Sequence, residues 1–145
     1  MKTQESIGRY ISCIYRHAQI FFEKELADFD ISRGGHVFLL ALARNDGIRQ
    51  EELSQHLKID KATTARAVKK LMEAGIVARV PDENDGRAFR LYLTEKGRRL
   101  LPEIRRISQK WTGLLLRNFE EREHVEVFRI LRRLSENAAA SRDSL

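Results

Sequence analysis

The sequence has one cysteine, two prolines and no long apolar run among its 145 residues. A single cysteine, Cys13, excludes an intramolecular disulfide framework and a zinc site built from several cysteines, so we expect a reducing, cytoplasmic compartment. No apolar stretch approaches the roughly 20 residues that span a bilayer. The polar residues 1–9 do not have the pattern of a signal peptide. We therefore expect a soluble protein that has no membrane partner.

Signatures of catalysis and of metal binding are also missing. The sequence contains no glycine-rich phosphate loop and no recognisable local pattern of a Ser/His/Asp triad. Its four histidines show no His-x-x-x-His spacing, and there is no Cys-x-x-Cys pair. We therefore expect no enzyme, no cofactor and no metal site.

Positive charge is what the sequence has in excess. It contains 27 Lys and Arg residues against 21 Asp and Glu residues, which gives a net charge of +6 and a pI near 9.8. This excess indicates an anionic partner. Charge alone does not distinguish a nucleic acid from a membrane surface or an acidic protein.

The spacing of apolar residues predicts a mainly α protein with one small β-hairpin, in a single domain 1–145. No run rich in proline, glycine or serine divides the chain. Helical periodicity changes to a strand-like pattern near residue 76 and then returns. We expect helices over about 7–26, 37–45, 50–57, 61–74 and 95–115, a last helix that begins near residues 118–120 and continues to about 134, and strands over 76–80 and 88–93.

The most specific signal is a pair of short helices, 50–57 and 61–74, that a tight turn joins. Asp60 is a strong N-cap for the second of them. Two such helices form a helix–turn–helix, and a charged hairpin directly after it forms a wing. This order predicts a winged helix–turn–helix head over about 32–93 that binds double-stranded DNA.

The second helix of the pair has one face suited to a DNA major groove. That face contains Lys61, Thr63, Arg66 and Lys70 at helical spacings, with the small Ala62 and Ala65 beside them. Arg66 is able to form a bidentate contact with guanine, and Thr63 offers a hydroxyl and a methyl group to base edges. The opposite side, which we expect to pack inward, contains Thr64, Ala67, Val68 and Leu71.

The wing supplies a second predicted contact. Arg87 is the cation of an otherwise acidic tip, residues 82–87, and suits a narrow minor groove, where the potential is most negative. Asp85 is placed to hold the Arg87 guanidinium through an ion pair. The alternative interpretation is a solvated basic helix face followed by an ordinary acidic turn. The full set of predicted DNA contacts is Arg49, Lys61, Thr63, Thr64, Arg66, Lys70, Arg79, Asp85, Arg87 and Arg90.

These segments resemble a known family. They read EELSQHLKIDKATTARAVKKLMEAGIVAR and then DENDGRAFRLYLTEKG, and they closely resemble the MarR family (multiple antibiotic resistance regulators). The resemblance is sharpest over 50–97, where the Asp-x-Arg wing precedes Leu-Thr-x-x-Gly at 93–97. It implies an obligate homodimer built from the first and last two helices, with one head on each half of a pseudo-palindromic operator. It also implies a transcriptional repressor that a small, often phenolic, molecule or oxidation releases from DNA.

The sequence departs from this family at three positions. Arg49 stands where a capping Ser or Thr is usual, so the helix after it either loses a side-chain cap or gains a phosphate contact. Lys58 replaces a common turn glycine, and a left-handed conformation there costs about 1 kcal/mol. Ala65 aligns with a second hydroxyl of the recognition helix, which removes one of the family's base contacts.

A homodimer is also expected from the residues themselves. The terminal segments, about 4–28 and 95–140, have more apolar surface than a small head covers, and a symmetric partner is the commonest way to bury it. The residues concerned are Ile7, Ile11, Ile14, Trp111, Leu115, Phe128 and Leu131. The effector, a small phenolic or aromatic anion, is implied by the resemblance alone. Its candidate binding residues are Arg16, His17 and Trp111, with an arginine of the head as a further counter-charge.

Two other functions remain as alternatives. A winged domain used only for protein contacts would bind duplex DNA weakly. An RNA-binding protein would present aromatic side chains for base stacking, and the exposed face of 61–70 has none. Cys13 lies where peroxide-sensing members of the family carry a reactive cysteine, but no tyrosine occurs between Phe21 and Phe89. A small buried apolar thiol is therefore the favoured interpretation of Cys13.

Overall fold

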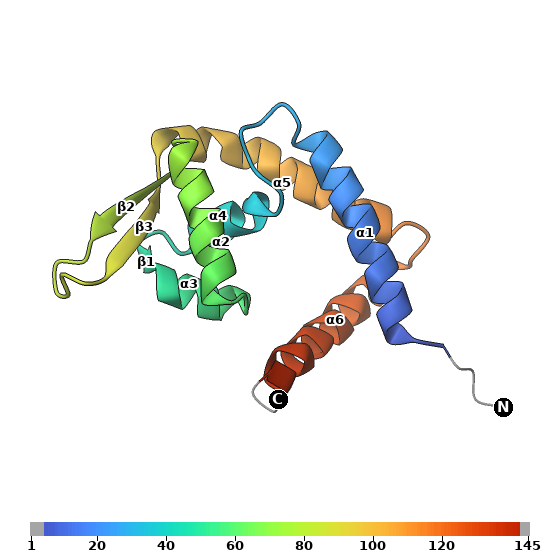
Figure 1. Ribbon diagram of the computed structural model, residues 1–145. Coiled ribbons are helices and arrows are strands. Elements are labelled where there is room, and N and C mark those ends of the chain that lie inside the picture. Colours follow the sequence, from blue (N-terminus) through green and yellow to red (C-terminus); the bar gives the residue numbers. More distant parts are fainter. Residues whose placement is uncertain (1–4, 143–145) are drawn as a thin grey trace. The chain divides into compact units, whose positions relative to one another are not determined.

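The computed structural model describes residues 5–142 and divides between Trp111 and Thr112 into two compact units. Within the described residues the chain forms six helices and a three-stranded antiparallel sheet, which confirms the predicted fold class (Figure 1). The elements are α1 (Ile7–Glu25), α2 (Gly35–Arg44), β1 (Ile48–Arg49), α3 (Gln50–Leu57), α4 (Lys61–Glu73), β2 (Val77–Pro81), β3 (Phe89–Leu93), α5 (Glu95–Leu115) and α6 (Glu121–Ser141). None of the helices in this range is both long and apolar enough to pass through a membrane.

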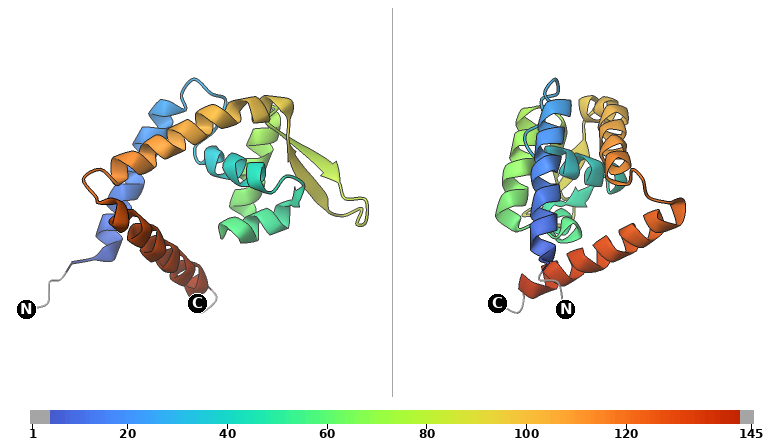
Figure 2. Two further views of the ribbon diagram at one scale, coloured as in Figure 1. Left: turned by 180° about the vertical axis from the view of Figure 1, so that it is seen from behind. Right: turned by 90° about the vertical axis from the view of Figure 1, so that its right-hand side faces the viewer.

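The sheet contains one strand that the sequence pattern did not predict. Its order is β1-β3-β2, and the short β1 pairs Ile48 with Leu91 and Arg49 with Arg90. Two residues are too few to show an alternating pattern, so only the pairing itself reveals the strand. The β2–β3 hairpin agrees with the prediction within one residue at each end, and its turn extends beyond the helices in the left view of Figure 2.

One hydrophobic core holds the first unit together. Its fully buried side chains come from the helices of the head, from the sheet and from α5. They are Leu39 and Leu42 of α2, Leu53 of α3, Val68 and Leu71 of α4, Ile76, Leu91 of β3, and Ile104 and Ile107 of α5. The C-terminal part of α1 adds Leu26, which is buried, and the partly buried Phe21 and Phe22. The head and the first part of α5 therefore fold around the same apolar cluster.

The junction between the wing and α5 explains the Leu-Thr-x-x-Gly segment. Thr94 Oγ1 accepts a hydrogen bond from the Gly97 backbone N–H at 3.1 Å and donates to the Gly75 carbonyl at 2.6 Å. A Cβ at Gly97 would lie 2.4 Å from the Ile76 carbonyl oxygen. Only glycine permits this close approach, so α5 begins directly against the residue that precedes β2. Helix α5 then continues through Pro102 without ending there.

The second unit contains the end of α5 and all of α6. Asn118 adopts a left-handed conformation with φ of 71°, and α6 begins after a capping box. In that box the Glu123 side chain accepts from the Glu120 backbone N–H at 2.9 Å, and the Glu120 side chain accepts in return. These contacts confirm the predicted restart of the helix near residues 118–120.

Candidate nucleic-acid interface

The turn between α3 and α4 fixes the geometry of the helix–turn–helix. Lys58 ends α3 with φ of 56° and ψ of 39°, which confirms the left-handed conformation expected there. Ser54 Oγ donates to the Ile59 carbonyl at 3.0 Å. Asp60 then caps α4, because its Oδ2 accepts from the Thr63 backbone N–H at 2.9 Å. The predicted cap is therefore confirmed, and it sets the first turn of α4.

The inner face of α4 is buried in the head. Thr64, Val68 and Leu71 are at most 1% exposed. The Thr64 hydroxyl donates to the Asp60 carbonyl at 3.0 Å, as a threonine in the first turn of a helix often does. The prediction of Thr64 as a DNA contact is wrong, because its side chain lies in the core and its only polar group is already satisfied.

The outer face of α4 is exposed and basic. Lys61, Arg66 and Lys70 are exposed, while Thr63 is half-buried. Arg66 Nη2 donates to Thr63 Oγ1 at 3.2 Å, and that hydroxyl donates to Asp60 Oδ1 at 2.7 Å. The two predicted base-reading side chains thus contact each other on one surface. Ala62 and Ala65 are also exposed there and add little bulk.

Lys69 is a further cation of α4 that the prediction omitted. Its side chain is exposed. It lies three residues after Arg66 and four after Ala65, so helical spacing places it beside the predicted face. The same periodicity that selected Arg66 and Lys70 would have found it.

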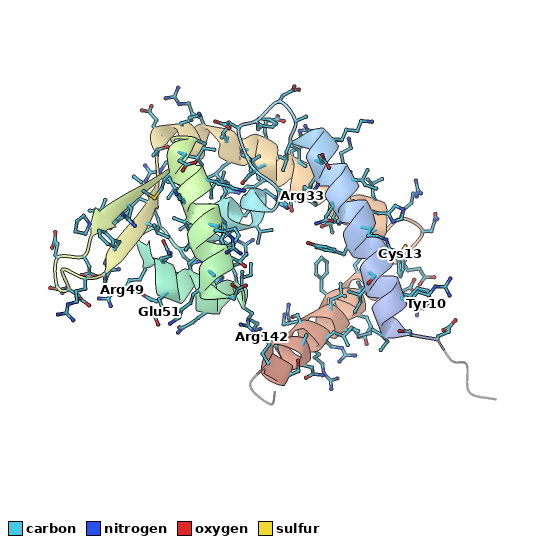
Figure 3. The ribbon with its side chains drawn as sticks, viewed as in Figure 1. Tyr10, Cys13, Arg33, Arg49, Glu51 and Arg142 are labelled. Atoms are coloured by element: carbon cyan, nitrogen blue, oxygen red, sulfur yellow. The ribbon has the colours of Figure 1, made fainter. Side chains whose placement is uncertain are left out.

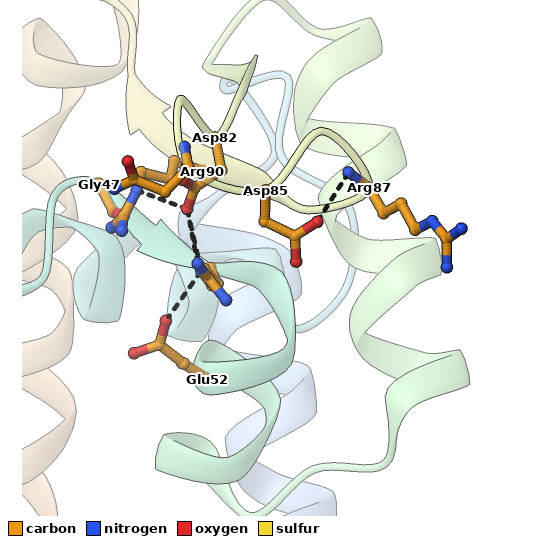
Figure 4. A network of polar contacts seen from close by, with 8 residues as sticks. Gly47, Glu52, Asp82, Asp85, Arg87 and Arg90 are labelled. Atoms are coloured by element: carbon orange, nitrogen blue, oxygen red, sulfur yellow. Dashed lines mark hydrogen bonds and ion pairs between the residues drawn. The ribbon is translucent and has the colours of Figure 1, made fainter.

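The wing tip carries Arg87 as predicted, but Asp85 holds it differently. Asp85 Oδ1 accepts a hydrogen bond from the Arg87 backbone N–H at 3.0 Å. Within residues 5–142 the two side chains form no ion pair, and Figure 4 shows the Arg87 guanidinium extending away from the carboxylate. The expected ion pair is wrong because the short Asp85 side chain folds back onto its own turn. Arg87 is exposed and its guanidinium points outward.

Asp82 is not part of an acidic tip but lies at the root of the wing. Its side chain is 1% exposed, and its Oδ2 forms ion pairs with Arg49 Nη2 at 2.9 Å and with Arg90 Nε at 3.0 Å (Figure 4). Arg90 Nη1 also donates to the Gly47 carbonyl at 2.8 Å. Both arginines were predicted to contact DNA, and the structure gives each an internal partner while leaving more than a third of each side chain exposed.

These contacts lower the pKa of Asp82. The Asn84 backbone N–H donates to Asp82 Oδ1 at 2.9 Å and is the largest cause, and the guanidinium groups of Arg49 and Arg90 add to it against the opposing effect of burial. The carboxylate therefore stays ionised near neutral pH. Its stabilising effect is present above the ordinary aspartate pKa and is lost only as the pH falls through the lower value of the folded protein.

Two more predicted contacts lie at the edges of this surface. Arg79, on β2, is exposed, and its guanidinium lies 4.2 Å from the centre of the Phe89 ring. Lys61 forms an ion pair with Glu51 at 3.2 Å, at the start of α3. Figure 3 shows Glu51 and Arg49 close together at that end of the head. The acidic Glu51 partly offsets the charge of Lys61.

A cleft of about 870 Å³ lies beside α4, within the first unit. It is bounded by α1, the α1–α2 loop, α2 and α4, and its size is within the usual range of small-molecule sites. Its apolar lining comes from Phe22, Phe29 and Val37, among others. Its cationic lining is Arg33, Arg66 and Lys70. Arg33 pairs with Glu23 at 3.4 Å, and both side chains are exposed.

None of the three residues named in advance for an effector lines this cleft. Arg16 is exposed, and His17 Nδ1 lies 2.8 Å from the Cys13 carbonyl oxygen. Trp111 packs against Phe21, with ring centres 5.1 Å apart. Tyr15 and Ala18 of α1 line the cleft, whereas Arg16 and His17 between them do not. A head arginine, Arg66, is the predicted counter-charge that does line it. Cys13 is exposed in the single chain rather than buried (Figure 3).

His36 is the most perturbed group in the wall of the cleft. Its ring stacks on Phe22, with centres 4.0 Å apart and planes at 16°. Its Nδ1 is buried and has no hydrogen-bond partner. Burial lowers the pKa of His36 to about 4, so the ring is neutral at pH 7. No group of three or more His, Cys, Asp or Glu side chains in the described part of the chain is arranged to hold a metal ion.

The fold and this surface define a winged helix–turn–helix DNA-binding protein. A model of the MarR family matches residues 29–88. The HTH-type transcriptional regulator YybA of Bacillus subtilis is 34% identical over 131 residues, which are 90% of this chain and 87% of that protein. The structure of a MarR transcriptional regulator from Methanosarcina mazei Go1 is 44% identical, with 91% of this chain and 95% of that chain covered and a TM-score of 0.83. The chain belongs to the MarR family of transcriptional regulators.

A third similar protein was solved together with DNA. It is a MarR-family regulator from Listeria monocytogenes in complex with a 26mer DNA, 30% identical, with 95% of this chain and 92% of that chain covered and a TM-score of 0.89. The proteins named here are regulators of transcription. The predicted family and the DNA-binding winged fold are thus confirmed.

The stability of the protein should depend on pH through His36. Because its pKa is about 4 in the folded state and near 6.5 when unfolded, the unfolded chain takes up the proton first as the pH falls. The free energy of unfolding should therefore decrease between pH 6.5 and pH 4.

Urea unfolding at pH 7 and pH 5, at one protein concentration, should show a smaller decrease in this free energy for His36→Phe than for the wild type. His56, which is exposed, gives the control His56→Gln. Equal decreases in all three proteins would contradict the burial of a neutral His36.

Proposed function

We propose that this protein is a sequence-specific repressor that binds a pseudo-palindromic operator as a homodimer and leaves it when a small effector binds. The observation that carries the proposal is the pairing of two reading elements in one head. One is the slim, basic outer face of α4, and the other is the projecting Arg87 of the wing. A helix of this width fits the major groove, and an arginine at a hairpin tip fits the adjacent minor groove.

Base reading is assigned to Thr63 and Arg66. The Arg66 side chain is exposed, and its contact with Thr63 Oγ1 places the two groups next to each other on the outer face of α4. Phosphate contacts are assigned to the surrounding cations, because backbone contacts position a protein without reading sequence. They are Arg49, Lys61, Lys70, Arg79 and Arg90.

Two substitutions should separate these roles. Arg66→Ala should cost about 1–3 kcal/mol of binding free energy on the preferred site and relax the preference at one position of each half-site. Arg87→Ala should instead weaken binding to most sequences and reduce the salt dependence by about one unit per lost contact. Selection of bound duplexes from a random library, followed by titrations at several salt concentrations, measures both effects.

The matched control is Arg44→Ala, at the end of α2. Arg44 is exposed and belongs to neither reading element, so this variant loses the same charge and should bind nearly as the wild type does. If the recognition face tolerates loss of Arg66 and binding is weak for every duplex, the alternative of a winged domain used only for protein contacts is favoured.

The proposed homodimer rests on apolar side chains that the single chain leaves exposed. They lie along the first part of α1, at the end of α5 and along α6. They are Ile7, Tyr10, Ile11 and Ile14, Leu114, Leu115 and Phe119, and Val125, Phe128, Ile130 and Leu131, each at least 40% exposed. Patches of this kind on a protein surface mark interfaces, and two-fold symmetry is the commonest arrangement. We assign the segments 4–28 and 95–140 to dimerisation and 32–93 to DNA reading.

Light scattering at micromolar concentration should give twice the chain mass of 16.9 kDa. Ile11→Lys places a charge in the exposed apolar face of α1 and should shift the equilibrium toward the monomer. The mass of both proteins should be followed as the concentration is lowered. A wild-type protein that stays folded and monomeric throughout this range would rule out recognition of a palindrome by two linked heads.

The proposed effector site is the cleft beside α4. Arg66 and Lys70 line the cleft and also belong to the basic face of the recognition helix. An anion bound there would attract two cations that DNA also attracts, while the aromatic wall at Phe22 and His36 would contact a flat ring. Ligand and DNA would then weaken each other's binding by the same factor. This supports a small aromatic anion as the effector class.

Calorimetry with a panel of phenolic acids should detect binding, and the ligand that binds should lower the affinity for DNA. Arg33→Ala should weaken ligand binding several-fold, since an exposed ion pair is worth about 0.2–1 kcal/mol, and should leave binding to DNA unchanged in the absence of ligand. Arg44→Ala again serves as the control, because Arg44 does not line the cleft. Absence of heat at millimolar ligand would remove these acids from consideration.

A further inference from the structure

Two arginines face each other across the root of the wing. In the pairing of β1 with β3, Arg49 lies directly opposite Arg90. Like charges at such a position repel each other and destabilise the pairing. Here a single carboxylate oxygen, Asp82 Oδ2, accepts a hydrogen bond from Arg49 Nε at 3.0 Å and forms ion pairs with Arg49 Nη2 at 2.9 Å and with Arg90 Nε at 3.0 Å. Asp82 thus neutralises a pair of cations that would otherwise push the two strands apart.

The same residue also organises the turn that carries Arg87. Its second oxygen, Oδ1, accepts from the Asn84 backbone N–H at 2.9 Å, and its own backbone N–H donates to the Ala88 carbonyl at 3.0 Å. The wing turn is therefore closed around Asp82. Because Arg49 is the N-cap residue of α3, the carboxylate links the turn of the wing to the start of the helix–turn–helix (Figure 4).

We propose that Asp82 is a positioning residue for DNA binding, which holds the wing in register with the helix–turn–helix through Arg49 and Arg90 so that Arg87 reaches the groove. The inference rests on the proposed contact of Arg87 with DNA. Asp82 itself does not touch the DNA, because its side chain is 1% exposed.

The proposal makes a prediction opposite in sign to simple electrostatics. Neutralising an acidic side chain makes the protein more positive and should by charge alone strengthen its attraction to DNA. Asp82→Asn removes the charge that holds Arg49 and Arg90, so the wing loses its fixed position. Positioning therefore predicts weaker binding from a variant whose net charge is more positive by one.

The experiment compares Asp82→Asn with Glu83→Gln in the full-length protein. Glu83 is the next residue and is exposed, so its variant makes the same change in charge and in chemical group at the same end of the hairpin. Asp82→Asn should bind duplex DNA more weakly than the wild type and show a salt slope lower by about one unit, as for a lost Arg87 contact. Glu83→Gln should bind as tightly as the wild type or more tightly.

A double-mutant cycle with Arg87→Ala tests whether Asp82 acts through that arginine. If it does, adding Arg87→Ala to Asp82→Asn should cost much less affinity than adding it to the wild type. Loss of folding would give the same pattern, so the comparison counts only for variants that circular dichroism shows to be folded and that still bind DNA measurably. Should Asp82→Asn fail to fold, Asp82→Glu keeps the charge but lengthens the side chain. It should still weaken DNA binding, whereas Glu83→Asp should not.

The possible results separate the two proposals. The positioning role alone would be overturned if Asp82→Asn bound DNA as tightly as Glu83→Gln does. It would also be overturned if the effects of Asp82→Asn and Arg87→Ala on affinity were additive. An Arg87→Ala variant that binds like the wild type would overturn the wing contact and, with it, the inference for Asp82.

Discussion

The packing of α4 against the head core is the constraint on which DNA recognition depends. Val68 and Leu71 are buried on one side of the helix, and Thr64 closes that side with an internal hydrogen bond. This fixes the rotation of α4 about its axis, so Arg66 and its neighbours are the side chains that reach solvent. The Asp60 cap fixes the start of the same helix. A recognition surface made of flexible side chains is thereby held on a rigid element.

Three acidic residues near this surface stabilise the fold through internal contacts. Asp60 caps α4, Asp85 closes the wing tip, and Asp82 holds two arginines at the root of the hairpin. Each carboxylate is engaged with a backbone N–H or a guanidinium. A basic DNA-binding surface tolerates these carboxylates because nearby N–H and guanidinium groups already bind them. Arg66 is exposed, and Arg87 is directed outward.

In the proposed function, the position of the cleft would couple ligand binding directly to the recognition helix. Arg66 and Lys70 extend from α4 and line the cleft on one side. No long chain of contacts is needed to connect an anion in the cleft with the DNA surface, because the same cations belong to both. His36 adds a neutral ring that stacks on Phe22 to the wall.

The order of elements and the identity of the reading helix follow from sequence, because helical periodicity, the cap at Asp60 and the glycines near the ends of elements are local signals. The MarR resemblance followed from the same local segments.

The sequence did not reveal β1 or the role of Asp82. Both depend on segments that are more than 30 residues apart in the chain and that meet in one sheet. Thr64 was placed on the inner side by periodicity but counted as a DNA contact for its hydroxyl, and only the packed core shows where that hydroxyl is bonded. A crevice between the terminal helices and the head was expected from the MarR resemblance, but its lining residues were not, because α1, α2 and α4 form its walls only after the core has brought them together. Sequence determined which residues carry charge and where helices begin, and tertiary structure decided which of those charges are free to act.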